Sequence, residues 1–246
     1  MPHSPVFATT HWSIVVAAGG ADTATAQQAL ARLCRSYWYP LYSYVRRRGF
    51  SPHDAEDLTQ EFFARFLEHG WVANADQLKG RFRNFLLSAL NHFLANEWDK
   101  AKAQKRGGGA VLLPLEFDSA ETRYSREPAD TATPEQHFEY RWAMTLLETV
   151  VARLRLEYDK EEKGALFSAL HPCLLGHRTS QPYDELSKKL GLSEGTIKSA
   201  VHRLRGRYRQ LLREEIAQTV DGTDEVEDEL RHLISVLAGN PSSFNG

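Results

Sequence analysis

The sequence has few cysteines, no long apolar run and almost no net charge. Only two of its 246 residues are cysteines. Cys34 and Cys173 are far apart and form no CxxC pair, so a disulfide framework and a cysteine zinc site are both unsupported. No apolar run reaches the ~18 residues of a membrane-spanning helix, and no basic segment followed by an apolar one opens the chain. We therefore expect reduced thiols, no membrane contact and a cytoplasmic location.

Two common catalytic motifs are also missing. The sequence contains neither the phosphate loop GxxxxGK[ST] nor the zinc motif HExxH, and its ten histidines are scattered. The nearest approach to a metal-ligand set is His171, Cys173 and His177. These residues flank Pro172 and lack a fourth ligand, which makes ordinary packing the better interpretation. We expect no catalysis, no cofactor and no metal site.

Charge is unevenly distributed along the chain. The formal net charge is only -2, and 42% hydrophobic residues suffice for one large or two small domains. Residues 79–106 and 183–213 nevertheless carry a net +5 each, whereas residues 116–139 carry -5 and residues 214–246 carry -7. Two basic modules are thus separated and followed by acidic segments, a distribution compatible with nucleic-acid binding.

Periodicity favours an all-α fold, because apolar residues recur every 3.6 positions and strand-like alternation is rare. Pro40 is expected to kink or break the first long helix. Ser51 and Thr133 have the sequence context of helix caps. The expected organisation is an N-terminal amphipathic extension (1–23), a first helical module (24–109), an acidic linker (110–133), a second module (134–220) and an acidic C-terminal helix extension (221–246).

Residues Tyr183 to Arg205 have the pattern of two short helices joined by a glycine turn. Gly191 supplies the left-handed conformation that ends the first helix, and Ser193 can cap the second. The second helix has a core stripe formed by Ile197, Val201 and Leu204. Its outward face is suited to phosphates and base edges in a major groove and carries Lys198, Ser199, His202, Arg203 and Arg205. A helical hairpin with a solvated basic face has the same spacing, so both interpretations stay open.

The helix expected after Ser51 has an acidic face opposite an apolar one. The apolar stripe consists of Ala55, Leu58, Phe62 and Phe66. The other face has no basic partner of its own and consists of Asp54, Asp57, Gln60 and Glu61. A solvated surface and a docking site for a protein explain this face equally well.

A third informative segment runs from Arg81 to Lys100. Its core stripe is expected to hold Phe82, Leu86, Ala89 and Phe93. The opposite side mixes amides, an aromatic and cations, namely Asn84, Ser88, Asn91, Trp98, Lys100, Lys102, Lys105 and Arg106. Such a surface can stack on or hydrogen-bond to unpaired bases while it follows the backbone. For Trp98 taken singly, a core position fits as well as a surface one.

The order of these elements resembles bacterial RNA polymerase sigma factors of the extracytoplasmic-function (ECF) type. The resemblance covers residues 24–213. It rests on an Asp-Ala-Glu-Asp-Leu-x-Gln-Glu helix, a Phe-Arg-x-aromatic-Leu helix ending in Lys/Arg, a linker and a Gly-Thr-Ile-Lys-Ser helix-turn-helix. It implies that the chain binds core RNA polymerase and directs promoter recognition and transcription initiation.

The resemblance also implies roles for individual residues. Docking on the clamp helices of the polymerase β′ subunit falls to Asp54, Asp57, Gln60 and Glu61. Opening and reading of the minus-ten element falls to Asn84, Ser88, Asn91, His92 and Trp98, with Lys100, Lys102 and Arg106 on phosphates. Reading of the duplex minus-thirty-five element falls to Lys198, Ser199, His202, Arg203 and Arg205. Ala200 departs from the pattern, since an arginine often follows the Lys-Ser pair.

The acidic C-terminal helix is an addition to the ECF pattern. Its apolar face carries Val226, Leu230, Leu233 and Leu237. We expect this face to pack on the second module, in preference to the alternative that its acids mask the basic recognition helix. An anti-sigma protein is a further partner of the family. The sequence leaves open whether such a protein or the tail holds the chain inactive.

Two other functions fit parts of the sequence. A helix-turn-helix regulator that binds promoters without being a polymerase subunit would not need the acidic face after Ser51 or the amide-aromatic helix. An all-α interaction scaffold would not need two basic modules.

Overall fold

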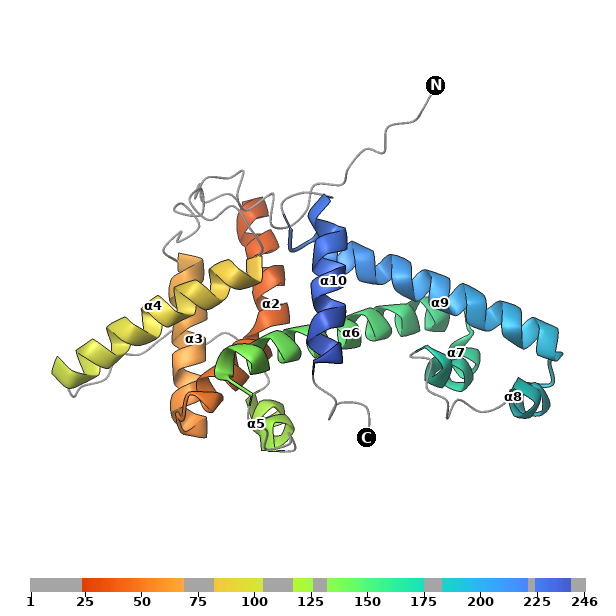
Figure 1. Ribbon diagram of the computed structural model, residues 1–246, viewed down its shortest axis with the longest axis horizontal. Coiled ribbons are helices and arrows are strands. Elements are labelled where there is room, and N and C mark those ends of the chain that lie inside the picture. Colours follow the sequence, from red (N-terminus) through yellow and green to blue (C-terminus); the bar gives the residue numbers. More distant parts are fainter. Residues whose placement is uncertain are drawn as a thin grey trace, which may run out of the picture. The chain divides into compact units, whose positions relative to one another are not determined.

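The computed structural model describes residues 24–68, 82–103, 117–125, 132–174, 183–220 and 224–239 (Figure 1). The regular elements in these ranges are all helical, which confirms the predicted all-α fold. They are α2 (Ala24–Arg47), α3 (Pro52–Glu68), α4 (Phe82–Ala103), α5 (Phe117–Ser125), α6 (Pro134–Lys160), α7 (Gly164–Leu170), the 3₁₀ helix η2 (His171–Cys173), α8 (Tyr183–Leu190), α9 (Glu194–Ala217) and α10 (Asp224–Ala238). The extension expected at 1–23 lies outside the described residues.

The chain divides into two compact units that do not follow the expected boundaries. The first unit combines residues 1–145 with residues 216–246, and the second comprises residues 146–215. The start of α6 and the C-terminal segment therefore belong with the first helical module. In sequence, the second unit is an insertion between two parts of the first.

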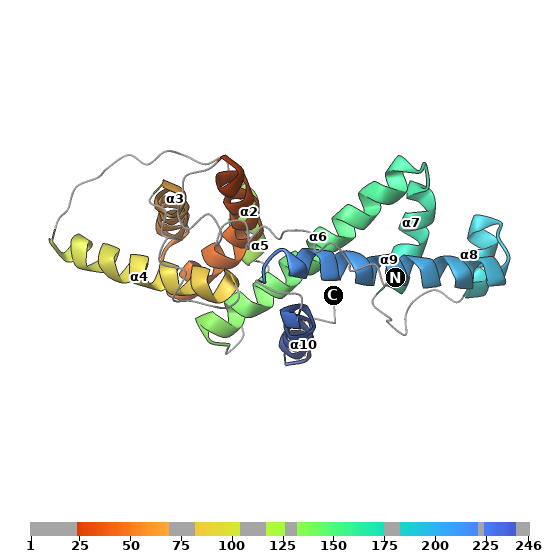
Figure 2. The same cartoon turned by 90° about the horizontal axis from the view of Figure 1, so that it is seen from above.

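An aromatic core holds α2, α3 and α4 together in the first unit. Phe62 of α3 lies 5.7 Å from Phe93 of α4 between ring centroids, and Tyr37 of α2 lies 5.1 Å from Phe82. Figure 2 shows α3 nearly end-on, beside α2 and above α4. Pro40 does not end α2, which continues to Arg47. Proline removes one intrahelical hydrogen bond, and burial of both flanking turns offsets that loss.

The expectation that residues 110–133 contain no packed structure is wrong for α5. Its Glu121 carboxylate accepts two hydrogen bonds of 3.0 Å from the Arg46 guanidinium and a third from the Tyr42 hydroxyl. Arg46 also stacks over the Tyr124 ring at 4.7 Å. Ala120 is buried. An acidic composition that favours a linker in isolation is thus matched here by an arginine of α2.

Side-chain caps fix the starts of α3 and α6 as predicted. The Asp54 backbone N–H donates to Ser51 Oγ at 3.1 Å. At α6, the Gln136 N–H donates to Thr133 Oγ1 at 3.2 Å, and Gln136 Oε1 accepts from the Thr133 N–H at 3.0 Å. This reciprocal arrangement is a complete capping box.

The second unit is built around the helix-turn-helix. Gly191 has φ +64°, and Ser193 Oγ accepts from the Thr196 N–H at 3.2 Å, so both predicted turn features are confirmed. The core of this unit draws on every helix in it and includes Val150, Leu154, Phe167, Leu170, Leu186, Ile197, Val201, Leu204 and Leu211.

The C-terminal helix α10 packs within the first unit. The expected contact with residues 134–220 is present at the start of α6, where His232 contacts Glu139 and Trp142. The contact with Arg83 of α4 was not expected. Val226 and Leu233 are buried as predicted, whereas Leu230 and Leu237 are half-buried. Glu229, one of the acids near the start of this helix, is buried. Its carboxylate pairs with Arg83 of α4, and this ion pair explains the preference of α10 for the first unit.

Candidate polymerase and DNA interfaces

The acidic face of α3 differs from its prediction in two respects. Gln60 is only 8% exposed, and Glu61 accepts a hydrogen bond from Arg65 of its own helix. Arg65 also donates to Glu97 of α4 at 2.7 Å. The buried face of α3 is wider than the single predicted stripe, because this helix packs against both α2 and α4. Gln60 therefore serves packing, and the acids have a basic partner.

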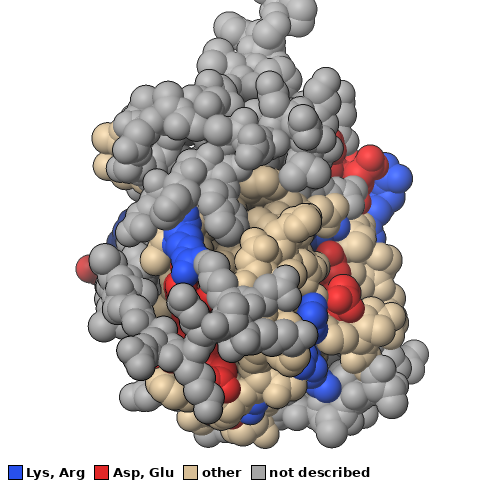
Figure 3. Space-filling model, turned by 90° about the vertical axis from the view of Figure 1, so that its left-hand side faces the viewer, with Lys and Arg blue, Asp and Glu red and all other residues tan. Residues whose placement is uncertain are grey.

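Asp54 and Asp57 keep the exposure that docking requires. Asp54 accepts from the Ser51 hydroxyl at 2.7 Å, which fixes it at the start of α3. Asp57 lies 3.6 Å from the ring of His53, and both side chains are largely exposed. Figure 3 shows one face of the molecule on which described acidic and basic side chains lie next to one another. Asp54 and Asp57 are therefore the exposed carboxylates of the predicted docking face.

The predicted outward face of α4 is only partly open. Asn84 and His92 are exposed, whereas Ser88 and Asn91 are half-buried. Trp98 is 58% exposed, so it belongs to the surface and not to the core. Most of the predicted stripe is buried, with Ala89 half-buried and Leu90 buried beside it. Lys100 and Lys102 lie within α4, but their side chains, like the whole of Arg106, are outside the described residues.

Asn91 is held in a polar cluster with Tyr44 of α2 and with Arg48, which follows α2. Its side-chain oxygen accepts from the Tyr44 hydroxyl at 2.8 Å and from the Arg48 guanidinium at 3.1 Å. The guanidinium also donates to the Tyr44 hydroxyl at 3.1 Å. Glu135 of α6 completes the group, with its carboxylate 3.0 Å from that hydroxyl. Sequence patterns single out Asn91 alone, because its partners come from helices distant in sequence.

Arg83 has a role that its place in a basic segment does not predict. Its side chain is 2% exposed, and its guanidinium pairs with Glu139 of α6 at 2.9 Å and with Glu229 of α10. It stacks over the Trp142 ring at 4.7 Å. A charge buried this deeply needs an acidic partner, and two segments 56 and 146 positions further along the sequence supply carboxylates. Arg83 is thus a structural residue of the first unit.

The same junction fixes the start of α4. The Phe82 N–H donates to the Thr219 carbonyl at 3.1 Å, which satisfies one of the orphan donors at this helix end. His232 of α10 also contacts Glu139, at 2.8 Å. The first unit therefore depends on the segment that follows α9.

The recognition face of α9 has the predicted exposure with one exception. Lys198, Ser199, His202 and Arg203 are exposed. Arg205 instead turns inward and donates from two nitrogens to the Cys173 carbonyl, at 2.9 and 2.7 Å. This contact anchors η2 to α9 and gives Arg205 a structural role that competes with its predicted DNA contact.

Ala200 is 5% exposed and belongs to the hydrophobic core of the second unit. Its position therefore faces the core of this protein. Accordingly, any phosphate contact by this helix comes from the neighbouring exposed residues.

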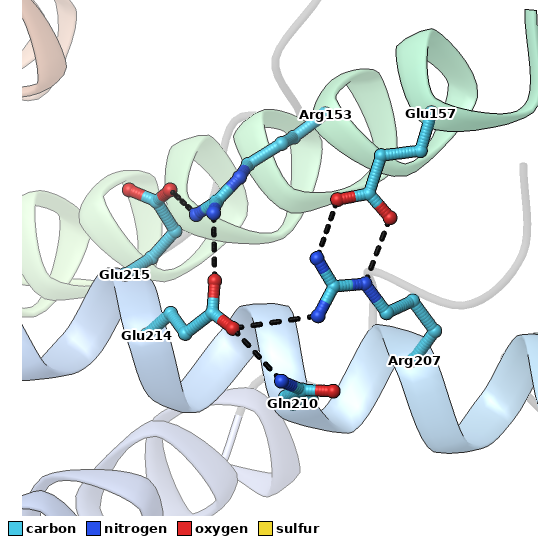
Figure 4. Close-up of polar contacts among 6 residues, drawn as sticks. All are labelled: Arg153, Glu157, Arg207, Gln210, Glu214 and Glu215. Atoms are coloured by element: carbon cyan, nitrogen blue, oxygen red, sulfur yellow. Dashed lines mark hydrogen bonds and ion pairs between the residues drawn. The ribbon is translucent and has the colours of Figure 1, made fainter. Parts of the chain in front are cut away.

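A network of ion pairs ties α9 to α6 within the second unit, as Figure 4 shows. Arg207 donates to both carboxylate oxygens of Glu157, at 2.8 and 2.5 Å. Arg153 of α6 bonds Glu214 and Glu215 at 2.6 and 2.7 Å. The Arg207 hydrogen bonds lower the pKa of Glu157. These contacts lie C-terminal to the predicted recognition residues of α9 and fix this helix against α6.

Two other polar sites have structural explanations. Cys173 is buried, and burial raises the pKa of its thiol, which disfavours the thiolate that a metal would require. Its predicted neighbour His177 lies outside the described residues. The stretch Gly191–Gly195 has GxSxG spacing, but Ser193 follows a helix and its hydroxyl caps α9. That context differs from the strand-to-helix elbow of serine hydrolases.

Part of the first unit is similar to a known protein family. Residues 29–104 match the family model of Sigma-70 region 2. The match supports a sigma factor. It runs from α2 through α4 and leaves the second unit uncovered. A region of this kind implies binding to core RNA polymerase and to promoter DNA. No solved structure matches the chain significantly. Within the part of the chain that the structure describes, no helix is long and apolar enough to cross a membrane.

Proposed function

We propose that the protein is a sigma factor of the ECF type that directs core RNA polymerase to promoters. The observation that carries this proposal is the Sigma-70 region 2 match over residues 29–104, followed in the same chain by a helix-turn-helix with an exposed basic face. Region 2 accounts for polymerase binding and promoter melting. The helix-turn-helix supplies the second, duplex-reading contact.

The proposed division of labour follows the two units. In the first unit, Asp57 with Asp54 contacts the clamp helices of β′, and the α4 face with Asn84, His92 and Trp98 receives unpaired bases. In the second unit, Lys198, Ser199, His202 and Arg203 read the minus-thirty-five duplex. The proposed chemistry consists of binding and strand opening, with no catalytic step in the chain itself.

In vitro transcription with purified core polymerase on genomic promoter fragments tests the proposal. The wild-type chain is expected to produce defined start sites that core polymerase alone does not produce. Promoter binding without core polymerase, and no transcription with it, would instead favour a helix-turn-helix regulator.

A charge reversal tests the docking surface. Asp57→Lys should weaken binding to core polymerase about tenfold, because a cation would replace the exposed carboxylate that is proposed to contact the β′ clamp helices. Glu56→Lys on the same helix is the matched control and should bind as wild type. Equal affinity for both variants, with native helicity by circular dichroism, would show that Asp57 is not part of the interface.

A further inference from the structure

Glu135, in the first turn of α6, places a carboxylate on the polar cluster formed by Tyr44, Arg48 and Asn91, which we call the Arg48 cluster. Its oxygen lies 3.0 Å from the Tyr44 hydroxyl. The same hydroxyl lies 2.8 Å from Asn91 Oδ1 and 3.1 Å from Arg48 Nη1. A tyrosine hydroxyl has one proton, so it donates to only one of the two oxygens at a time. The contacts of Glu135 and Asn91 therefore compete.

The position that Glu135 occupies suits an anion. Arg48 is exposed and permanently charged, the Tyr44 hydroxyl is a donor, and an amide such as Asn91 can present its NH₂ group after rotation. The carboxylate itself is stabilised as an anion. Its pKa is lowered by a hydrogen bond from its own backbone N–H and by the Tyr44 hydroxyl.

The backbone at Glu135 is fixed, but its side chain is accessible to solvent. The Thr133–Gln136 capping box fixes the backbone of this turn, while the Glu135 side chain is exposed. An exposed carboxylate can leave by rotation without unfolding the helix. Asn91, the member of the Arg48 cluster that lies in the middle of α4, is one of the residues that the sigma-factor motif assigns to the unpaired strand.

We infer that the Arg48 cluster is a seat for a backbone phosphate of the unpaired promoter strand, and that Glu135 occupies this seat until the strand displaces it. The inference rests on the proposed function and adds two contacts, Arg48 and Tyr44, that the sequence motif does not assign. Guanidinium and hydroxyl donors are ordinary phosphate ligands in nucleic-acid complexes. Glu135 thereby sets a threshold for strand capture.

Fluorescence anisotropy with a labelled single-stranded promoter oligonucleotide, measured on the full chain over a salt series, tests this inference. Glu135→Gln keeps the shape and an acceptor for Tyr44 but removes the charge. It should raise strand affinity about two- to fivefold, the range of an exposed ion pair. Glu148→Gln, an exposed position on the same helix, is the matched control for net charge and should change affinity less.

A double-mutant cycle separates the seat from general electrostatics. Arg48→Ala should weaken strand binding and make the salt slope less steep by ~0.7, the value for one phosphate contact on a single strand. In the Arg48→Ala background, Glu135→Gln should lose most of its effect. Inorganic phosphate at the same ionic strength as chloride should compete only weakly, because a strand binds through several contacts.

Three outcomes would overturn the inference. The first is unchanged affinity for Glu135→Gln, or no measurable strand binding by either protein. The second is a gain that persists in Arg48→Ala or equals that of Glu148→Gln. The third is strong competition by inorganic phosphate, which would indicate a free-anion site. Transcription with core polymerase is scored separately. If the wild type supports transcription but Glu135→Gln does not change strand affinity, only this inference is rejected. If the wild type does not support transcription, the proposed function is rejected.

Discussion

Arginine side chains illustrate how position on a helix decides function at the scale of the residue. Arg203 and Arg205 are two positions apart on α9, which turns their side chains by roughly 200°. Arg203 is exposed on the recognition face, whereas Arg205 is bonded to the Cys173 carbonyl. Arg83 is buried and pairs with two carboxylates. Net positive charge in a segment is therefore a poor guide to which cations meet DNA.

Alanine substitutions should separate Arg203 from Arg205. Arg205→Ala should lower the free energy of unfolding by about 1–2 kcal/mol, because two charge-assisted hydrogen bonds are lost. Arg203→Ala should leave stability unchanged and cost ~1–3 kcal/mol in duplex binding if the side chain contacts a base. Chemical denaturation and promoter-duplex anisotropy measure the two effects. A stable Arg205→Ala protein with weakened, sequence-specific binding would restore Arg205 to the interface.

The Arg207–Glu157 pair predicts a pH dependence of stability. The Arg207 hydrogen bonds lower the pKa of Glu157 in the folded state. A depressed carboxyl pKa adds stability above the unfolded value of ~4.3, and this contribution disappears as the pH falls through the folded pKa. Glu157→Gln should therefore be less stable than wild type at pH 7, and the difference should shrink toward pH 3. Melting temperatures across this range check the sign, and a constant difference would contradict it.

Residue-level predictions succeeded where periodicity alone decides the outcome. Four of the five recognition residues are exposed because the apolar stripe of α9 fixes the opposite face. The burial of Gln60 and the contacts of Asn91 and Arg205 were not foreseen, because they depend on residues elsewhere in the chain. Spacing within one helix contains no information about a carbonyl 32 positions away, such as that of Cys173.

At the scale of the element, local chemistry predicted where helices start and tertiary contacts decided the rest. The caps at Ser51, Thr133 and Ser193 are as expected, since each involves residues only three positions apart. α5 was missed because its stability depends on Arg46. α10 was recognised as a helix, but its contact with Arg83 of α4 was not foreseen, because an apolar stripe does not specify which surfaces cover it.

The buried carboxylate of α10 should be among its strongest attachments. Glu229→Ala removes one of the two carboxylates that pair with the buried Arg83 and leaves its ion pair with Glu139. This substitution should lower the free energy of unfolding by about 3 kcal/mol. Glu227→Ala, at an exposed position two residues earlier, should change stability by less than ~0.5 kcal/mol. Denaturant titration of both variants compares them. Similar small losses would mean that the pair is not formed in solution.

Removal of the whole element distinguishes packing from masking. Deletion of residues 223–246 should lower the melting temperature and weaken binding to core polymerase, because α10 belongs to the unit that carries the Sigma-70 region 2 match. Promoter-duplex affinity at low salt should not rise. A truncated chain that melts like wild type and binds duplex several-fold more tightly would show that the acidic tail masks the recognition helix.

At the scale of the whole molecule, local charge should outweigh net charge in DNA binding. The chain carries a formal charge of -2, yet residues 183–213 carry +5. We expect duplex affinity to fall steeply with salt, and Lys198→Ala to reduce the slope by ~0.9 if this side chain binds a phosphate. Lys160→Ala is the control outside the helix-turn-helix. Binding that is insensitive to salt would contradict an electrostatic interface.

The division into units was the least predictable property of the whole chain. Glycine, proline and charge patterns placed a boundary in the acidic segment before α6, whereas the structure groups the start of α6 and residues 216–246 with the first unit. The contacts responsible join residues 56 and 146 positions apart, at Glu139 and Glu229 around Arg83. Composition along a linear sequence cannot reveal such pairs.

The junction at Arg83 also has a consequence for biosynthesis. Glu229 is synthesised 146 residues after Arg83. At ~5–20 residues per second, the first unit of each new molecule waits about 7–30 s for its second carboxylate. A chain that stops before Glu229 contains all of α2 to α4, but its Arg83 lacks one of the two carboxylates that it pairs with in the complete unit. Translation through Glu229 is thus a condition for finishing the part of the protein that is made first.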